Sequence, residues 1–100
     1  MDFDLTCESI FQSIFPVAKS VAAPIAYIEI AFSPELSCCK NKIHDYFKKI
    51  SWDTELSSSD ICVKEDPTLE KSTIKIVRLV EFADDEGNEG VHEINKIIKV

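Results

Sequence analysis

Cysteine and histidine are the side chains of this chain best suited to metal binding or nucleophilic catalysis, and their spacing is irregular. They are Cys7, Cys38, Cys39, Cys62, His44 and His92. Protein zinc sites use clustered ligands at short, fixed spacings such as C-x-x-C, and these residues show no such spacing. Adjacent Cys38 and Cys39 would point to different sides of a helix. The sequence therefore predicts no metal and no cofactor, and reduced thiols rather than a disulfide framework.

Cys7 is the thiol whose position best suits catalysis, because a helix N-terminus lowers the pKa of a nearby thiol. A nucleophile also needs a base close to it, and only His44 or His92 could serve. The competing interpretation is that Cys7 belongs to an apolar helix stripe, where a buried thiol packs as an inert small side chain. The pattern favours packing, so we expect a non-enzymatic protein. A small thiol- or metal-dependent enzyme is the disfavoured alternative.

The most acidic part of the chain lies between Arg78 and Lys96 and contains no lysine or arginine; we call residues 79–95 the acidic segment. Its carboxylates are Glu81, Asp84, Asp85, Glu86, Glu89 and Glu93. A calcium-binding EF-hand loop needs glycine at its sixth position and glutamate at its twelfth. Counted from Asp84, those positions hold Glu89 and Asn95. The segment is therefore predicted to be a solvated turn whose carboxylates form one negative surface.

The distribution of charge predicts which partners are suitable. The formal net charge is −7, and residues 51–100 hold twelve acids and six bases, a net charge of −6. Such a surface repels the phosphates of nucleic acids and anionic lipids, so we expect no direct nucleic-acid binding and no membrane binding. A protein with a basic surface is the expected partner. The expected function is regulation or inhibition of that partner. The competing interpretation is that the charge serves solubility alone.

The polar segment 51–59 adds three residues to the predicted partner-binding surface: Trp52, Asp53 and Glu55. The carboxylates of Asp53 and Glu55 would extend the negative surface of the acidic segment. Trp52 has two interpretations. A single tryptophan after a helix commonly covers the edge of the core, or it serves as an exposed anchor for a partner. The sequence favours the interpretation that Trp52 covers the edge of the core. The alternative, an exposed anchor, is the reason for including Trp52 in the predicted binding site.

The N-terminal region has the character of neither a signal peptide nor a membrane span. A signal peptide begins with basic residues, whereas this chain begins with Asp2, Asp4 and Glu8. The apolar stretch that follows contains charged residues and prolines, which makes it a poor membrane span. We expect a cytoplasmic protein.

Two helices are predicted from the spacing of apolar residues. Residues 5–22 place apolar side chains three and four positions apart, although Pro16 would kink this helix or divide it in two. Residues 33–50 begin with Ser33, Pro34 and Glu35, a pattern typical of a helix start. The second helix is amphipathic and should lie against a sheet.

Four further segments alternate as strands do. Residues 25–32 and 73–82 are apolar on both faces, which is typical of inner strands. In the second strand, one face is expected to hold Ile74, Ile76, Val80 and Phe82, with Arg78 interrupting it, and the other face Val77 and Leu79. Residues 60–65 fit a short strand. Residues 91–100 fit a strand or a helix, and we favour a strand because it would form a hairpin with residues 73–82.

These elements predict an α+β fold with the order α-β-α-β-β-β, in one compact domain over residues 1–100. We expect a three- or four-stranded, mostly antiparallel sheet with two helices packed on one face. Its C-terminal strand would lie at an edge, where it could pair with a second copy of the chain. A homo-oligomerising structural or accessory subunit is therefore the alternative to a protein-binding module.

Overall fold

The computed structural model describes residues 3–21, 23–52, 54 and 56–100, with side chains described from residue 5 onward. Its elements follow the predicted order α-β-α-β-β-β, with a 3-10 helix, η1, leading into the second helix. Their bounds are α1 (Phe3–Ser20), β1 (Ile25–Phe32), η1 (Pro34–Cys39), α2 (Lys40–Ile50), β2 (Asp60–Glu65), β3 (Thr73–Glu81) and β4 (Val91–Lys99). The α+β class is confirmed, and so is the strand at the C-terminal end of the sequence.

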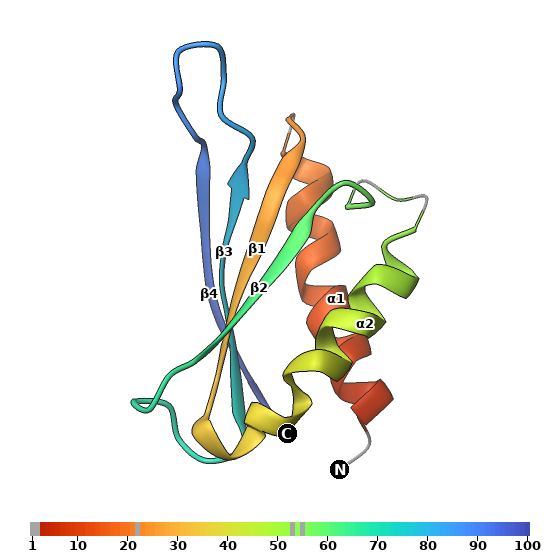
Figure 1. Cartoon of the computed structure of the whole chain (residues 1–100), viewed down its shortest axis with the longest axis vertical. Helices are drawn as coiled ribbons and strands as arrows, with labels where there is room; N and C mark the ends of the chain where they lie inside the picture. The colour runs from red at the N-terminus through yellow and green to blue at the C-terminus, as the bar shows by residue number, and fades with distance from the viewer. Residues whose placement is uncertain (1–2, 22, 53, 55) are drawn as a thin grey trace.

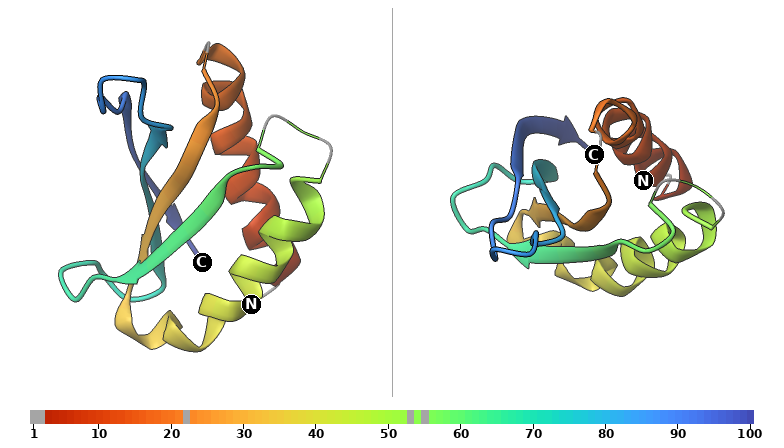
Figure 2. Two further views of the ribbon diagram at one scale, coloured as in Figure 1. Left: turned by 45° about the horizontal axis from the view of Figure 1, so that its top comes forward. Right: turned by 90° about the horizontal axis from the view of Figure 1, so that it is seen from above.

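The strands form one four-stranded sheet in the order β2-β1-β3-β4. β1 pairs in parallel with β2 and antiparallel with β3, and β3 pairs antiparallel with β4. The sheet is therefore mixed and mostly antiparallel. β1 and β3 are the inner strands, as their apolar patterns predicted. Both helices lie on the same face of the sheet, and among the described residues no helix covers the other face (Figures 1 and 2).

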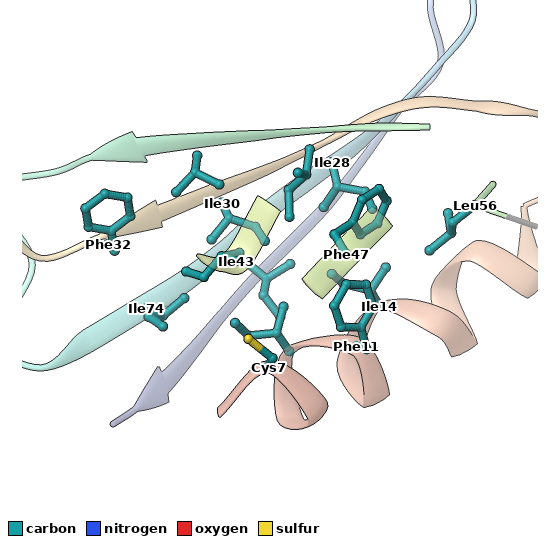
Figure 3. Packing of buried hydrophobic residues seen from close by; sticks show 14 of the residues in the cluster. Cys7, Phe11, Ile14, Ile28, Ile30, Phe32, Ile43, Phe47, Leu56 and Ile74 are labelled. Carbon is teal, nitrogen blue, oxygen red and sulfur yellow. The ribbon is translucent and has the colours of Figure 1, made fainter. Parts of the chain in front are cut away.

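The core lies between the sheet and the two helices (Figure 3). Helix α1 buries one stripe of side chains at helical spacing: Cys7, Ile10, Phe11, Ile14 and Ala18. The stripe continues past Pro16, and α1 runs through this residue as one helix. The two helices meet where the rings of Phe11 and Phe47 stack, with ring centroids 5.3 Å apart. Burial of these apolar side chains is the main favourable contribution to folding.

The inward face of β3 differs from the prediction because one extra residue interrupts its alternation. Ile30 of β1 is opposite Ile76 and Glu29 is opposite Arg78, so Val77 is the extra residue on β3. A β-bulge of this kind shifts the side-chain alternation by one position. Leu79 therefore continues the core face, while Val80 lies on the opposite face and is nevertheless buried.

The start of the second helical region also differs in detail from the prediction. Ser33 precedes η1 without capping it, and its side chain is fully buried. Its hydroxyl donates to Glu35 Oε1 at 2.9 Å and accepts from the Thr73 backbone N–H at 3.2 Å. Ser33 therefore joins the end of β1 to the start of β3. In the described part of the chain, none of the helices combines the length and the apolar character needed to cross a lipid bilayer.

Candidate functional site

The acidic segment forms the loop end of the β3–β4 hairpin, and we call residues 82–90 the hairpin loop. This loop extends past the end of the sheet at which β1 and β2 begin (Figure 1). All of its carboxylates belong to exposed residues: Asp84, Asp85, Glu86 and Glu89. The hairpin therefore gathers four of the six predicted carboxylates of the acidic segment on one protruding loop.

Asp84 holds the hairpin loop in shape. Its Oδ1 accepts hydrogen bonds from the backbone N–H groups of Glu86 and Asn88, each at 2.9 Å. The Asp84 backbone adds a bond to Asn88 O at 2.9 Å and one from Gly87 N at 3.0 Å. The hydrogen bonds from the Asn88 and Glu86 amides lower the pKa of Asp84, because they favour the charged carboxylate. The loop is thus a turn with an internal structure of its own.

Three other carboxylates of the hairpin loop face solvent: Asp85, Glu86 and Glu89. Among the described residues, no ion pair and no side-chain hydrogen bond includes their carboxylates. Gly87, at φ 83°, makes the turn that brings them together, and glycine adopts this left-handed conformation without steric cost. The loop therefore presents three uncompensated negative charges.

Glu81 and Glu93 lie on the strands below the loop and have partners there. Glu81 Oε2 is 2.5 Å from His92 Nε2, and the Glu81 carboxylate fills the space that a Cβ at Gly90 would need. Glu93 Oε1 accepts a hydrogen bond from Arg78 Nε at 2.9 Å. These two residues complete the predicted set of six, but their charges are not free in the way the loop charges are.

The uncovered face of the sheet carries a row of charges that the sequence pattern did not predict; we call it the charge ladder. It contains one residue from each strand, in the order Lys64, Glu29, Arg78 and Glu93. Lys64 Nζ lies 3.3 Å from Glu29 Oε1, and Arg78 Nη1 pairs with Glu29 Oε2. Cross-strand neighbours of opposite charge stabilise a sheet. The ladder has no net charge, and it accounts for the charged residues Glu29 and Arg78 among the apolar side chains of β1 and β3.

The electrostatics of the charge ladder agree with its geometry. Arg78 has its pKa raised, chiefly by the hydrogen bond to Glu93 and also by Glu29. Lys64 has its pKa raised by its contact with Glu29. In both cases a neighbouring carboxylate favours the charged form of the base. The signal available in the sequence was the charged residue near the middle of each inner strand, which needs a partner of opposite sign on the neighbouring strand.

Trp52 is 82% exposed, so it does not cover the edge of the core. The residue of its loop that does so is Leu56, which is fully buried. Beside Trp52 the surface is hollowed by a cavity of about 330 Å³, lined by Phe47, Lys48, Ser51, Trp52, Ser57, Ser58, Ser59 and Asp60. The predicted binding residues Asp53 and Glu55 lie outside the described residues.

Topology places the Trp52 loop and the hairpin loop at the same end of the sheet but at opposite edges. The Trp52 loop leads into the start of β2, and the hairpin loop joins the end of β3 to the start of β4. β2 and β4 are the two edge strands, and Ile25 and Glu81 pair at the same end of β1 and β3. The structure therefore does not merge Trp52 with the hairpin loop into one patch.

The candidate groups for catalysis and metal binding are separated in the described chain. Cys7 lies on the core-facing side of α1 and is fully buried, as the apolar stripe of this helix predicted. The described residues contain no cluster of three or more histidine, cysteine, aspartate or glutamate side chains placed to hold a metal ion. Cys38 and Cys39 differ from the prediction: one residue is exposed and the other buried, yet their sulfur atoms meet at 3.8 Å.

A scan against protein-family models and searches among curated proteins and solved structures found no match to this chain.

Proposed function

We propose that this chain is a non-enzymatic protein-binding module whose hairpin loop contacts the basic surface of a partner protein and regulates or inhibits that partner. The observation that supports the proposal is the placement of Asp85, Glu86 and Glu89 on a loop beyond the sheet, where their exposed carboxylates form no ion pair with any described residue. A concentrated charge of one sign steers a partner of opposite sign toward the loop and raises the rate of encounter.

The internal structure of the hairpin loop favours binding. The hydrogen bonds of Asp84 already hold the loop backbone, so less conformational entropy is lost when a partner binds. The charge ladder contributes little to such an interaction because its opposite charges are already paired. The four paired charges of the ladder thus lie on a face of the sheet, whereas Asp85, Glu86 and Glu89 lie on the loop at its tip.

Trp52 is the second proposed contact. An exposed tryptophan is typical of residues that contribute most to protein interfaces, and Trp52 lies at the same end of the sheet as the hairpin loop. A partner that lies across this end would meet the carboxylates at one edge and Trp52 at the other, with Asp53 and Glu55 beside it in sequence. Interfaces of this kind combine a charged rim with an aromatic anchor.

The experiment compares three forms of the chain as immobilised baits for proteins of a native extract, at low and at high salt. The loop variant carries Asp85→Asn, Glu86→Gln and Glu89→Gln. The control variant carries Glu8→Gln, Asp45→Asn and Glu65→Gln, three exposed acids elsewhere on the molecule, so that its net charge equals that of the loop variant. We expect wild type and control to retain the same basic protein at low salt and to lose it at high salt, because exposed charges are screened.

Equal capture by the loop variant would overturn the proposed role of the hairpin loop. Capture that is insensitive to salt would overturn the electrostatic mechanism. In that case Trp52→Ala, which changes no charge, tests whether binding depends on the aromatic contact instead.

Pairing between copies of the chain is the second candidate, because β4 is an edge strand with exposed Val91 and Ile97. The strand is not regular, however. Its pairing with β3 shifts register between Ile76 and Arg78, and Asn95 opposite this shift has φ 53°. Bulges of this type protect sheet edges from pairing with other chains. We therefore favour the partner-binding proposal, and a dimer in sedimentation experiments at tens of micromolar would reverse this preference.

A further inference from the structure

The thiols of Cys38 and Cys39 form a pair that the proposed function does not use. The two residues close the 3-10 helix η1, where the chain passes into α2. Their sulfur atoms lie 3.8 Å apart in hydrogen-bond contact, and both cysteines are free. Consecutive residues of a 3-10 helix are about 120° apart around its axis, so this contact depends on how the two side chains turn toward each other.

The contact joins an accessible thiol to a protected one. Cys38 is exposed, while Cys39 is 6% exposed and packs in the core with Leu36. Burial, followed by the hydrogen bond with Cys38, raises the pKa of the Cys39 thiol. A reagent from solution therefore meets the Cys38 thiol first. Once it is bonded to Cys38, it lies close enough to react with the Cys39 thiol as well.

The geometry disfavours a disulfide between these thiols. Adjacent Cα atoms across a trans peptide are about 3.8 Å apart, whereas disulfides usually need about 4.4–6.8 Å. The sulfur atoms would also have to close to about 2.0 Å. A disulfide would therefore distort the junction of η1 and α2.

The same geometry suits an atom that bonds to both sulfurs. A centre with bonds of about 2.3 Å to each sulfur, the length of a zinc–thiolate bond, holds them roughly 3.4–3.8 Å apart for bond angles near 95–110°. The observed separation of 3.8 Å lies at the upper end of this range. Little movement is needed, since the sulfurs already lie close to the required distance.

We propose that Cys38 and Cys39 form a bidentate site for a thiophilic centre that needs two thiolate ligands, and specifically for a trivalent arsenical with one organic substituent. In such a compound the arsenic atom forms three bonds. One bond joins it to the organic group, and the other two can join it to two thiolates. A structural zinc site would instead need four ligands, and the described residues offer no cluster of even three.

The reaction is a condensation without any change of oxidation state. One molecule of phenylarsine oxide and the two thiols form two arsenic–sulfur bonds. The arsenic–oxygen bonds break, and the oxygen leaves as water with the two thiol protons. Arsenic stays trivalent, so neither an oxidant nor a reductant is required.

The site is independent of the proposed partner-binding surface. η1 follows the C-terminal end of β1, whereas the hairpin loop lies at the end where β1 begins. Figure 1 shows η1 and the hairpin loop at opposite ends of the molecule. A failure of one proposal therefore does not affect the other.

The test treats the folded chain with phenylarsine oxide and measures intact mass in excess monothiol. We expect one adduct on wild type that survives the monothiol and is removed by a small dithiol. Because the second arsenic–sulfur bond forms within one molecule, half-labelling of wild type should need a concentration roughly 100-fold lower than half-labelling of Cys38→Ser. Cys62→Ser serves as the matched control and should behave as wild type.

Two outcomes would overturn the assignment. The first is an adduct that Cys38→Ser retains with full resistance to the monothiol. The second is wild-type protein that forms no resistant adduct. Cys38 is exposed, so its replacement should leave the fold intact, and the far-ultraviolet circular dichroism spectrum of each variant checks this.

Discussion

Replacing Leu56 and Trp52 in turn should separate the packing residue of the 51–59 loop from its exposed aromatic residue. Leu56 is fully buried, while Trp52 is 82% exposed. Leu56→Ala removes buried methylene groups worth about 0.8 kcal/mol each and leaves a cavity. We expect it to lower the free energy of unfolding by about 2–5 kcal/mol. Trp52→Ala should change it by less than about 0.5 kcal/mol, as for most surface substitutions.

Urea denaturation followed by circular dichroism measures both effects. With a slope of about 1–3 kcal/mol per molar urea for a small protein, a loss of about 3 kcal/mol shifts the midpoint by roughly 1–3 M. The midpoint of Trp52→Ala should stay within a few tenths of a molar of wild type. Trp52 is the only tryptophan of the chain, so its fluorescence gives a second readout: a soluble quencher should reach it freely in the folded protein.

The reasoning would be refuted by the opposite order of the two effects. If Trp52→Ala were the more destabilising change, Trp52 would be a packing residue and could not be an available contact for a partner. If Leu56→Ala were neutral, the loop would not be fastened to the core at this position. Leu56→Ile, which keeps the volume of the side chain, should recover most of the lost stability.

Three further predictions concern the hairpin loop and the thiol pair. Gly87 has φ 83°, so Gly87→Val should destabilise the folded chain by roughly 1–2 kcal/mol in urea denaturation, and an unchanged midpoint would show that the turn does not need this conformation. The pKa of Asp84 is lowered in the folded chain, so its contribution to stability is present above the unfolded-state pKa and is lost as pH falls through the folded-state pKa. Amide hydrogen exchange at Glu86 and Asn88, corrected for intrinsic rates, should therefore accelerate in acid. Asp84→Ala should abolish this pH dependence. Because Cys38 is exposed and the pKa of Cys39 is raised, iodoacetamide should alkylate Cys38 first in the folded chain, as peptide mapping would show, and equal labelling of both would contradict this order.

The elements of the fold could be predicted from the sequence because local patterns determine them. The alternation of residues 25–32 gives the bounds of β1 as they are observed, and the apolar stripe around Cys7 gives the buried face of α1. The hairpin that orders the acidic segment also follows from proximity in sequence. In each case the decisive interactions are periodic and short in range.

Features that depend on distant residues could not be predicted in the same way. The bulge at Val77 moves Leu79 into the core in place of Val80, and such a shift depends on pairing with both neighbouring strands. Leu56, rather than Trp52, fills the core edge because tertiary packing selects the side chain that fits. The contact between Cys38 and Cys39 depends on side-chain rotation, which periodicity does not report.

The charge ladder is one reason why the carboxylates of the acidic segment divide into a paired and an unpaired group. Arg78 lies between Glu29 and Glu93 across adjacent strands, so pairing on the sheet uses the carboxylate of Glu93. His92 pairs with Glu81 next to it, and Asp84 is occupied by backbone amides. Strand pairing and turn formation thus satisfy three of the six acids. The other three lie on the loop beyond the last strand residues, where no ion pair among the described residues includes them, and this leaves their charges available to the basic partner that we propose.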